Sequence, residues 1–141
     1  MTLQAAITQF KTWTPTDFLS VEGLDDYHTW PIPDEKMPMA LLTMSGLGGQ
    51  GYAPYEFGGD FNFAVAATVY LVAGGLGMPG AVESELITMF DNFAVAVEAD
   101  PRLNDNLQRP MMVELVSTAP VSIAGYRYRA WELRLVWIVK Y

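Results

Sequence analysis

The last sixteen residues of the chain, 126–141, alternate between apolar and other side chains with a period of two. The apolar side chains stand at the odd positions Trp131, Leu133, Leu135, Trp137 and Val139. This alternation predicts a long β-strand with one face turned toward a hydrophobic core. A strand of this length can bury that face only as part of a sheet, so the fold must contain one.

A second periodic segment supplies a cover for that sheet. Between Gly80 and Ala99, apolar residues recur at intervals of three and four, which places them on one stripe of an amphipathic helix. They are Val82, Leu86, Met89, Phe90, Phe93 and Val97. Because such a stripe needs an apolar surface to pack on, we expect this helix to lie across one face of the sheet.

The remaining elements are shorter. Leu3, Ala6, Ile7 and Phe10 predict an N-terminal helix that ends near Trp13, and three further strands are expected at 37–44, 61–73 and 111–118. The segment 17–36 reads as acidic and turn-rich. We therefore predict an α+β fold: a mainly antiparallel sheet of about four or five strands, one long helix across a face and a short N-terminal helix. Residues 1–141 form one domain, with a Gly-rich loop at 45–60.

Composition indicates that other subunits cover part of the surface. Charged residues make up 17% of the chain and hydrophobic residues 51%, whereas soluble domains average ~25% charged. The glycines within 61–78 argue against a membrane helix, and the first ten residues do not resemble a signal peptide. With no cysteine, a cytosolic origin is expected.

The charges divide unevenly along the chain. Residues 1–100 hold 13 acids against two lysines, a net −11, and residues 101–141 hold three acids against six basic residues, a net +3. Opposed halves suit head-to-tail contacts in a ring, although they can equally neutralise one another within one subunit. On this basis we expect a subunit interface that includes five charged residues: Arg127, Arg129, Arg102, Asp91 and Glu98.

Three patterns suggest chemistry that their surroundings do not support. Gly46, Gly48 and Gly51 match a dinucleotide-binding fingerprint, but no helix follows to hold a pyrophosphate. His28 lies near two aspartates without further metal ligands, and the acid pairs lack calcium-loop spacing. We therefore predict no catalytic residue, no metal site and no cofactor, and interpret the chain as a protein other than an enzyme.

Arg127, Tyr128 and Arg129 form a basic and aromatic segment. With Trp131, they resemble a platform that stacks bases and binds phosphates. Strand alternation places both arginines on the side of Trp131, so they can equally cover its ring or reach an acidic neighbour. We favour ion pairing over nucleic-acid binding, because a strongly acidic protein binds phosphate backbones poorly.

The C-terminal part of the chain, residues 82–141, resembles the tail-terminator (tail-completion) proteins of long-tailed bacteriophages. The resemblance lies in the order helix, acidic-Pro-x-Leu at 99–103, short loop, strand and hairpin over 82–141, with a second point of contact at 33–38. The family often has glycine where this chain has Asn104. The resemblance implies a hexameric ring in the virion, at the head-proximal end of the tail, assembled in the host cytoplasm.

Such a ring would bind the tail-tube protein and the head-completion or connector protein, and DNA would pass through its lumen without specific binding. We expect Tyr52, Tyr55 and Phe57 in the Gly-rich loop to contact a partner, because large exposed aromatic groups gain from burial at an interface. Two alternatives stay open. One is a tail-tube or head–tail connector subunit, and the other is a small-ligand-binding domain with a pocket lined by Trp131, Trp137, Tyr126 and methionines.

Overall fold

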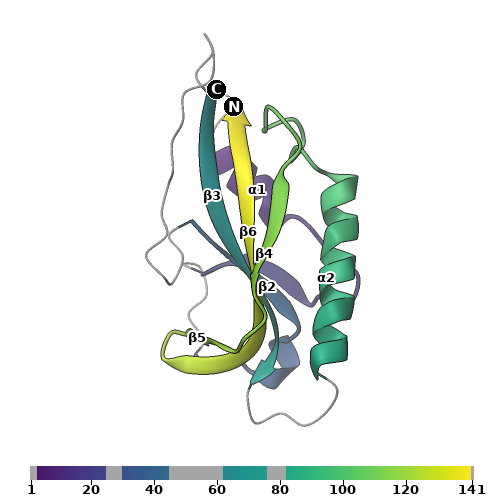
Figure 1. The fold of residues 1–141 in the computed structure, drawn as a ribbon, viewed down its shortest axis with the longest axis vertical. Coiled ribbons are helices and arrows are strands. Elements are labelled where there is room, and N and C mark those ends of the chain that lie inside the picture. Colours follow the sequence, from purple (N-terminus) through teal and green to yellow (C-terminus); the bar gives the residue numbers. More distant parts are fainter. Residues whose placement is uncertain (1–2, 25–29, 45–61, 76–81, 141) are drawn as a thin grey trace.

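The computed structural model describes residues 3–24, 30–44, 62–75 and 82–140, which form an α+β fold (Figure 1). Two α-helices, α1 (Leu3–Lys11) and α2 (Val82–Ala99), and a 3-10 turn, η2 (Asp34–Lys36), accompany the strands. The strands are β1 (Ser20–Gly23), β2 (Met39–Thr43), β3 (Asn62–Gly75), β4 (Met112–Ser117), β5 (Val121–Ile123) and β6 (Tyr126–Lys140). The predicted class is confirmed, as are both helices and the four strands expected from periodicity.

The six strands form one mixed sheet in the order β1-β2-β3-β6-β4, and β5 pairs with the start of β6. All neighbouring pairs are antiparallel except β1 and β2, which run parallel. The sheet thus has more strands than the four or five predicted. The two additional strands, β1 and β5, have four and three residues, which is too short for alternation to distinguish them from loops.

The long pair β3 and β6 forms the centre of the sheet. Every residue from Ala67 to Gly74 in β3 is buried, because this strand has neighbours on both edges and apolar layers on both faces. The ladder shifts between Val72 and Gly74, where β3 carries an irregularity opposite Ala130 and Arg129. A central strand of this kind is apolar on both sides, which explains its run of valine and alanine.

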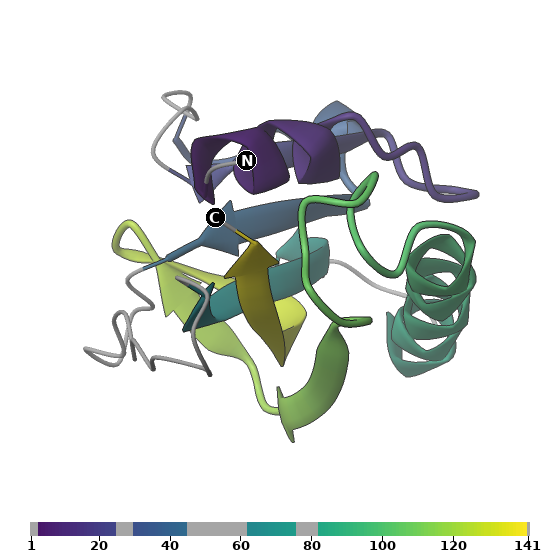
Figure 2. The ribbon, with the colours of Figure 1, turned by 90° about the horizontal axis from the view of Figure 1, so that it is seen from above.

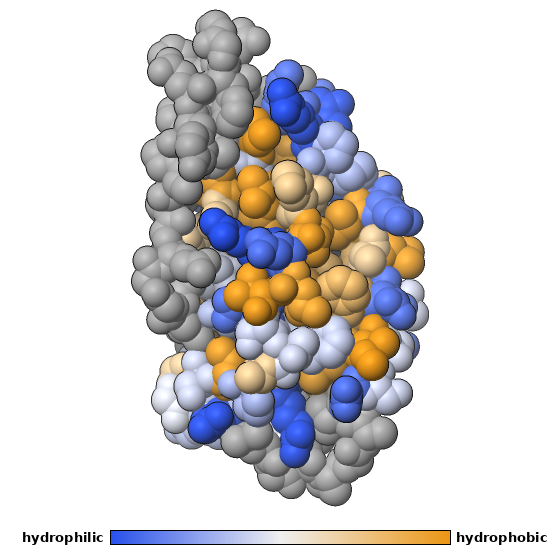
Figure 3. Space-filling model, viewed as in Figure 1, coloured by the Kyte–Doolittle hydropathy of each residue, from blue (hydrophilic) through white to orange (hydrophobic). Residues whose placement is uncertain are grey.

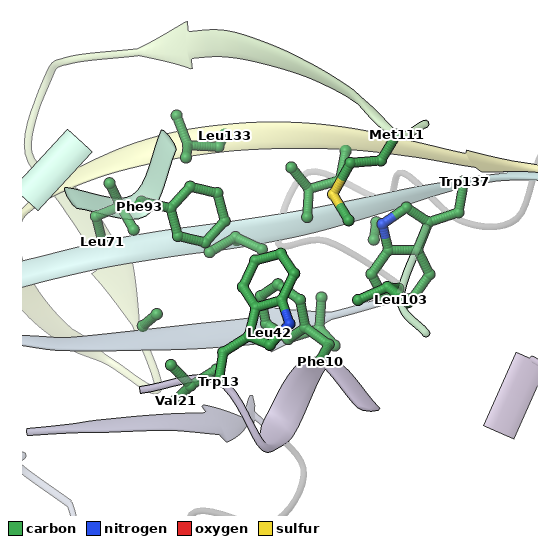
Figure 4. Packing of buried hydrophobic residues seen from close by; sticks show 14 of the residues in the cluster. Phe10, Trp13, Val21, Leu42, Leu71, Phe93, Leu103, Met111, Leu133 and Trp137 are labelled. Atoms are coloured by element: carbon green, nitrogen blue, oxygen red, sulfur yellow. The ribbon is translucent and has the colours of Figure 1, made fainter. Parts of the chain in front are cut away.

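One face of the sheet is covered by both helices. Seen from above in Figure 2, α1 lies toward the end of the sheet that holds β1 and β2, and α2 stands beside β3 and β6. Phe10 of α1 packs against Trp13, Phe93 and Trp137, with ring centroids 4.9, 6.2 and 5.9 Å apart (Figure 4). The apolar stripes predicted for α2 and β6 therefore meet in this core.

Among the described residues, a second apolar cluster covers one end of the opposite face. There the segment around Ile32 and Met37 packs on Tyr70 and Tyr128. The backbone N–H of Ile32 donates a hydrogen bond to the Tyr128 hydroxyl, 3.0 Å away. The segment around Ile32 and Met37 thereby covers the end of the sheet near β5. The border formed by β4, in contrast, has exposed apolar side chains.

A carboxylate connects the two helices. Asp100, directly after α2, accepts hydrogen bonds from Gln9 Nε2 (3.0 Å), Trp13 Nε1 (2.9 Å) and the backbone N–H of Asn104 (2.7 Å). Burial raises the pKa of Asp100, but the hydrogen bonds from Gln9, Trp13 and Asn104 outweigh it and hold the pKa below its usual value. This one side chain fixes the end of α1 against the end of α2.

Candidate assembly surfaces

The most unusual surface of the molecule is the outer border of the sheet at β4. Five consecutive residues, Met112 to Val116, are exposed. Large apolar side chains dominate, since Met112 is 69% exposed, Leu115 42%, Val116 43% and Val113 37%. β4 lies at the front in Figure 1, and Figure 3 shows apolar side chains gathered over it and toward α2.

Both faces of β4 contribute to this exposure. Val113 and Leu115 are the register partners of Leu135 and Leu133, which belong to the helix-covered core. Met112 points to the other face, as the partner of Val136. Proteins usually protect a free strand edge with charged residues or proline, but β4 carries a single charge, at Glu114. Within the described residues β4 pairs only with β6, so its other edge is open.

The sheet ends on its other side at β1. Leu19, just before this strand, is 59% exposed, and its backbone N–H donates to the carbonyl of Pro38 at 2.9 Å. Leu19 thus lies beside the start of β2, one residue before the β1–β2 ladder begins at Ser20. The acids of this border are Asp17, which is exposed, and Glu22, which is partly exposed.

The outward face of α2 combines acids with apolar side chains. Asp91 and Glu98, both expected at an interface, are exposed there. Ile87 and Val95 are 47% and 65% exposed. Within the described residues, no ion pair involves these acids.

Arg127 and Arg129 lie on β6 close to a tight hairpin turn. Ala124 and Gly125 form the turn between β5 and β6 with φ values of 52° and 82°, the backbone that two-residue hairpins favour. Both arginines are exposed. Arg129 lines one shallow hollow together with Trp131 and Glu83, which agrees with the predicted placement of the arginines and Trp131 on one side.

Trp131 itself is a packing residue. It is partly buried, and its ring lies 6.0 Å from that of Phe90 on α2, measured between centroids. A ring committed to this contact offers less surface for stacking bases. The geometry therefore gives no support to a base-stacking platform at Trp131.

Arg102 is engaged in its own loop. Its Nη2 lies 2.6 Å from Asp105 Oδ1, and its Nε donates to the carbonyl of Leu107 at 3.0 Å. Leu103, Asn104 and Asp105 adopt positive φ values in this loop, a conformation that an asparagine or aspartate tolerates best. Arg102 therefore has a structural role, in addition to any role at an interface.

The five predicted interface residues do not form one patch. Arg127 and Arg129 lie by the hairpin turn, Asp91 and Glu98 on the outward face of α2, and Arg102 in the loop that follows α2. Acids also lie close to two of these basic residues, because Arg102 pairs with Asp105 and Arg129 shares a hollow with Glu83. The five residues therefore lie in three separate regions of the surface.

The residues of the alternative ligand pocket also lie apart. Trp137 is completely buried in the core against Phe10, and Tyr126 is 43% exposed at the hairpin turn. Trp131 contributes to a hollow that neither of them lines. Within the described residues, Trp131, Trp137 and Tyr126 thus lie in three different surroundings.

Several predicted features lie outside the described residues. These are the Gly-rich segment with Tyr52, Tyr55 and Phe57, and His28 with its neighbouring aspartates. In the part of the chain that is described, no three acids or histidines are placed to hold a metal ion. No described helix is long and apolar enough to cross a membrane.

Sequence reasoning did not identify the open edges as a site. A signal was present, because Met112 and Val113, and again Leu115 and Val116, are adjacent apolar residues where a half-buried strand would alternate. The Asp100 contacts carried only a generic signal, an aspartate after a helix. The chain matches no known family model, and it has no significant match among curated proteins.

Proposed function

We propose that this protein is a structural assembly protein of a long-tailed phage virion. It forms a closed ring that caps the tail tube, stops tube polymerisation and offers a docking face to the head-completion or connector complex. The observation that carries this proposal is the open, apolar edge of β4, with large side chains exposed on both faces of the strand. A subunit that keeps such an edge gains stability when another chain covers it.

The distribution of charge supports a ring of identical subunits. The exposed arginines lie near the β5–β6 turn, and exposed acids lie on α2 and beside β1. A head-to-tail contact brings two different surfaces together, so opposite charges on them favour one orientation. A ring with a net charge of −8 per subunit would also repel DNA in its lumen, which lets DNA pass without binding.

A tail-tube or connector subunit would use the same kinds of surface, so the test must separate these roles. Light scattering after size exclusion should give the mass of a closed ring, or of a subunit that closes into a ring on tail tubes. Purified protein added to growing tubes should bind one end and stop elongation. In a phage that encodes the chain, its deletion should give tubes of uncontrolled length.

Two outcomes would contradict the proposal. A strict monomer at high concentration that also fails to bind tubes would exclude a ring protein. Incorporation along the whole tube, in place of one end, would identify a tube subunit.

A further inference from the structure

We propose that β4 of one copy pairs with β1 of the next, so that the sheet continues from subunit to subunit. The inference rests on the proposed ring and names the surfaces that close it. It commits to a second copy of this chain as the occupant of the open β4 edge.

Strand polarity permits this pairing. β1 and β2 run in one direction, β3 in the other, β6 again with β2, and β4 again with β3. The two outer strands of one subunit therefore point in opposite directions. When copies follow one another around an axis, β4 meets β1 of the neighbour in antiparallel orientation, the arrangement that forms a regular ladder.

Side-chain orientation limits the register. Val113 and Leu115 face the helix-covered side. In β1, Val21 faces this same side, because it is the register partner of Ala40 and belongs to the same core. In a continued sheet, Val21 must therefore lie opposite Val113 or Leu115, so that the apolar side chains of both strands stay on the helix-covered face.

Of the registers that satisfy this condition, one joins the exposed leucines. It places Leu115 opposite Leu19, Val113 opposite Val21, Glu114 opposite Ser20 and Met112 opposite Glu22. A shift of two residues in one direction would place Glu114 opposite Glu22, and like charges directly opposite destabilise a sheet. A shift in the other direction would leave Leu115 unpaired.

The extent of the two edges agrees with this register. The β4 ladder is regular from Met112 to Leu115 and shifts only beyond, between Leu115 and Ser117. Four residues of β4 are thus available for regular pairing. On the other border, β1 contributes Ser20, Val21 and Glu22 to this register, and Leu19 lies one residue before the strand.

Charge favours a second copy over an unrelated strand. Arg109, which lies just before β4, is exposed. Arg127 and Arg129 are also exposed, and they lie on β6, after the C-terminal end of β4 and the hairpin turn. Asp17 and Glu22 lie on the border with β1. Joining these borders brings basic and acidic groups together. Pairing β4 with β4 of another copy would instead bring the Glu114 residues close and leave Leu19 exposed.

Cysteine cross-linking tests the pairing directly, because the chain has no cysteine of its own. Leu19→Cys and Leu115→Cys both replace exposed side chains, so the fold should tolerate them, which circular dichroism checks. Within one subunit the two positions lie at opposite borders of a sheet five strands wide, about 19 Å apart. A disulfide requires Cα atoms within about 7 Å, so it can form only between copies.

Mild oxidation of the L19C/L115C protein should give covalent dimers and higher multiples up to the ring. Mixing the two single variants should give a dimer. The matched control is L19C with Ile87→Cys, which pairs the same cysteine with an exposed residue of α2 and should yield at least tenfold less product. Dimers from L115C alone would indicate pairing of β4 with itself and would overturn the inference.

The same experiment separates this inference from the proposed function. A ring by mass without the 19–115 cross-link would refute the pairing and leave the ring intact. A cross-linked ring that fails to cap tubes would refute the function and leave the pairing intact. A strict monomer refutes both.

A charge exchange gives an independent measurement. Leu115→Lys alone and Leu19→Glu alone should each raise the dissociation constant of assembly at least tenfold, because each buries an unpaired charge. The double variant should recover most of the affinity. Absence of recovery in a folded double variant would overturn the inference.

Discussion

Replacing Asp100 with alanine should uncouple α1 from the end of α2. The carboxylate accepts hydrogen bonds from side chains of residues 9 and 13 and from the backbone of residue 104. It therefore joins segments that are about ninety residues apart in the chain. Trp13 Nε1 donates to this carboxylate, so the loss of Asp100 removes the acceptor that the indole N–H has in the folded protein.

The magnitude follows from the burial of the donors. Trp13 is only 8% exposed, so water replaces its lost acceptor poorly, whereas Gln9 and Asn104 are more exposed and regain water. A hydrogen bond to a charged group contributes about 1.5–3 kcal/mol. We expect D100A to lower the free energy of unfolding by about 2–3 kcal/mol, which for a domain of this size lowers Tm by about 6–10 °C.

Chemical denaturation of D100A and Trp13→Phe, singly and together, measures the coupling. W13F keeps a ring in the core but removes the N–H donor. The loss of unfolding free energy caused by W13F should therefore be smaller by about 1 kcal/mol or more in the D100A background than in the native protein. Asp91→Ala removes an exposed carboxylate from the same helix and should change stability by less than about 0.5 kcal/mol. If D100A costs no more than this control, Asp100 does not hold the helices together.

The pH dependence has a definite sign. Because the pKa of Asp100 is lowered in the folded protein, its contribution to stability is present above the unfolded pKa, near 3.9, and is lost as pH falls through the folded pKa. The stability difference between the native protein and D100A should therefore shrink below about pH 4. A difference that grows on acidification would refute the charged hydrogen-bond explanation.

Three further predictions concern assembly. Reversing the charge of Arg127 and Arg129 should weaken ring formation most at low salt, and reversing an opposed acid should partly restore it; normal assembly of the double reversal at every salt concentration would exclude this role. The isolated protein should show negligible DNA binding at about 0.15 M salt, and salt-sensitive binding would instead favour the arginines as phosphate ligands. Replacing residues 48–55 with a short Gly-Ser linker should preserve folding, monitored by circular dichroism, and abolish tube or head attachment; unimpaired completion of tails would show the segment to be dispensable.

The fold could be predicted where one face of an element is apolar and the other is not. β6 and α2 have long stretches of regular periodicity, and their stripes meet in the core as expected. β1 has only four residues and lies in a segment with many turn-forming residues, so no period could develop. Its parallel pairing with β2 depends on the path of the connection between the two strands, which local sequence does not encode.

The candidate site was less predictable, because it depends on which neighbour an element lacks. The sequence of β4 indicates an apolar strand, and an interior strand of β3 type would have a similar composition. The difference between them lies in sheet order: β3 has partners on both edges, and β4 has one. That order is set by contacts between residues far apart in the chain, so local periodicity does not contain it.

The low charged fraction of the chain agrees with the apolar side chains exposed at its sheet borders. A low charged fraction of 17% indicated surface that another subunit covers, without indicating where. The structure locates exposed large apolar side chains at β4, at Leu19 and on the outer face of α2. Because the first two lie on opposite borders of one sheet with opposed strand directions, a single repeated contact can cover both. Every copy in a closed ring makes that contact twice, once with each border, so no apolar strand edge is left open.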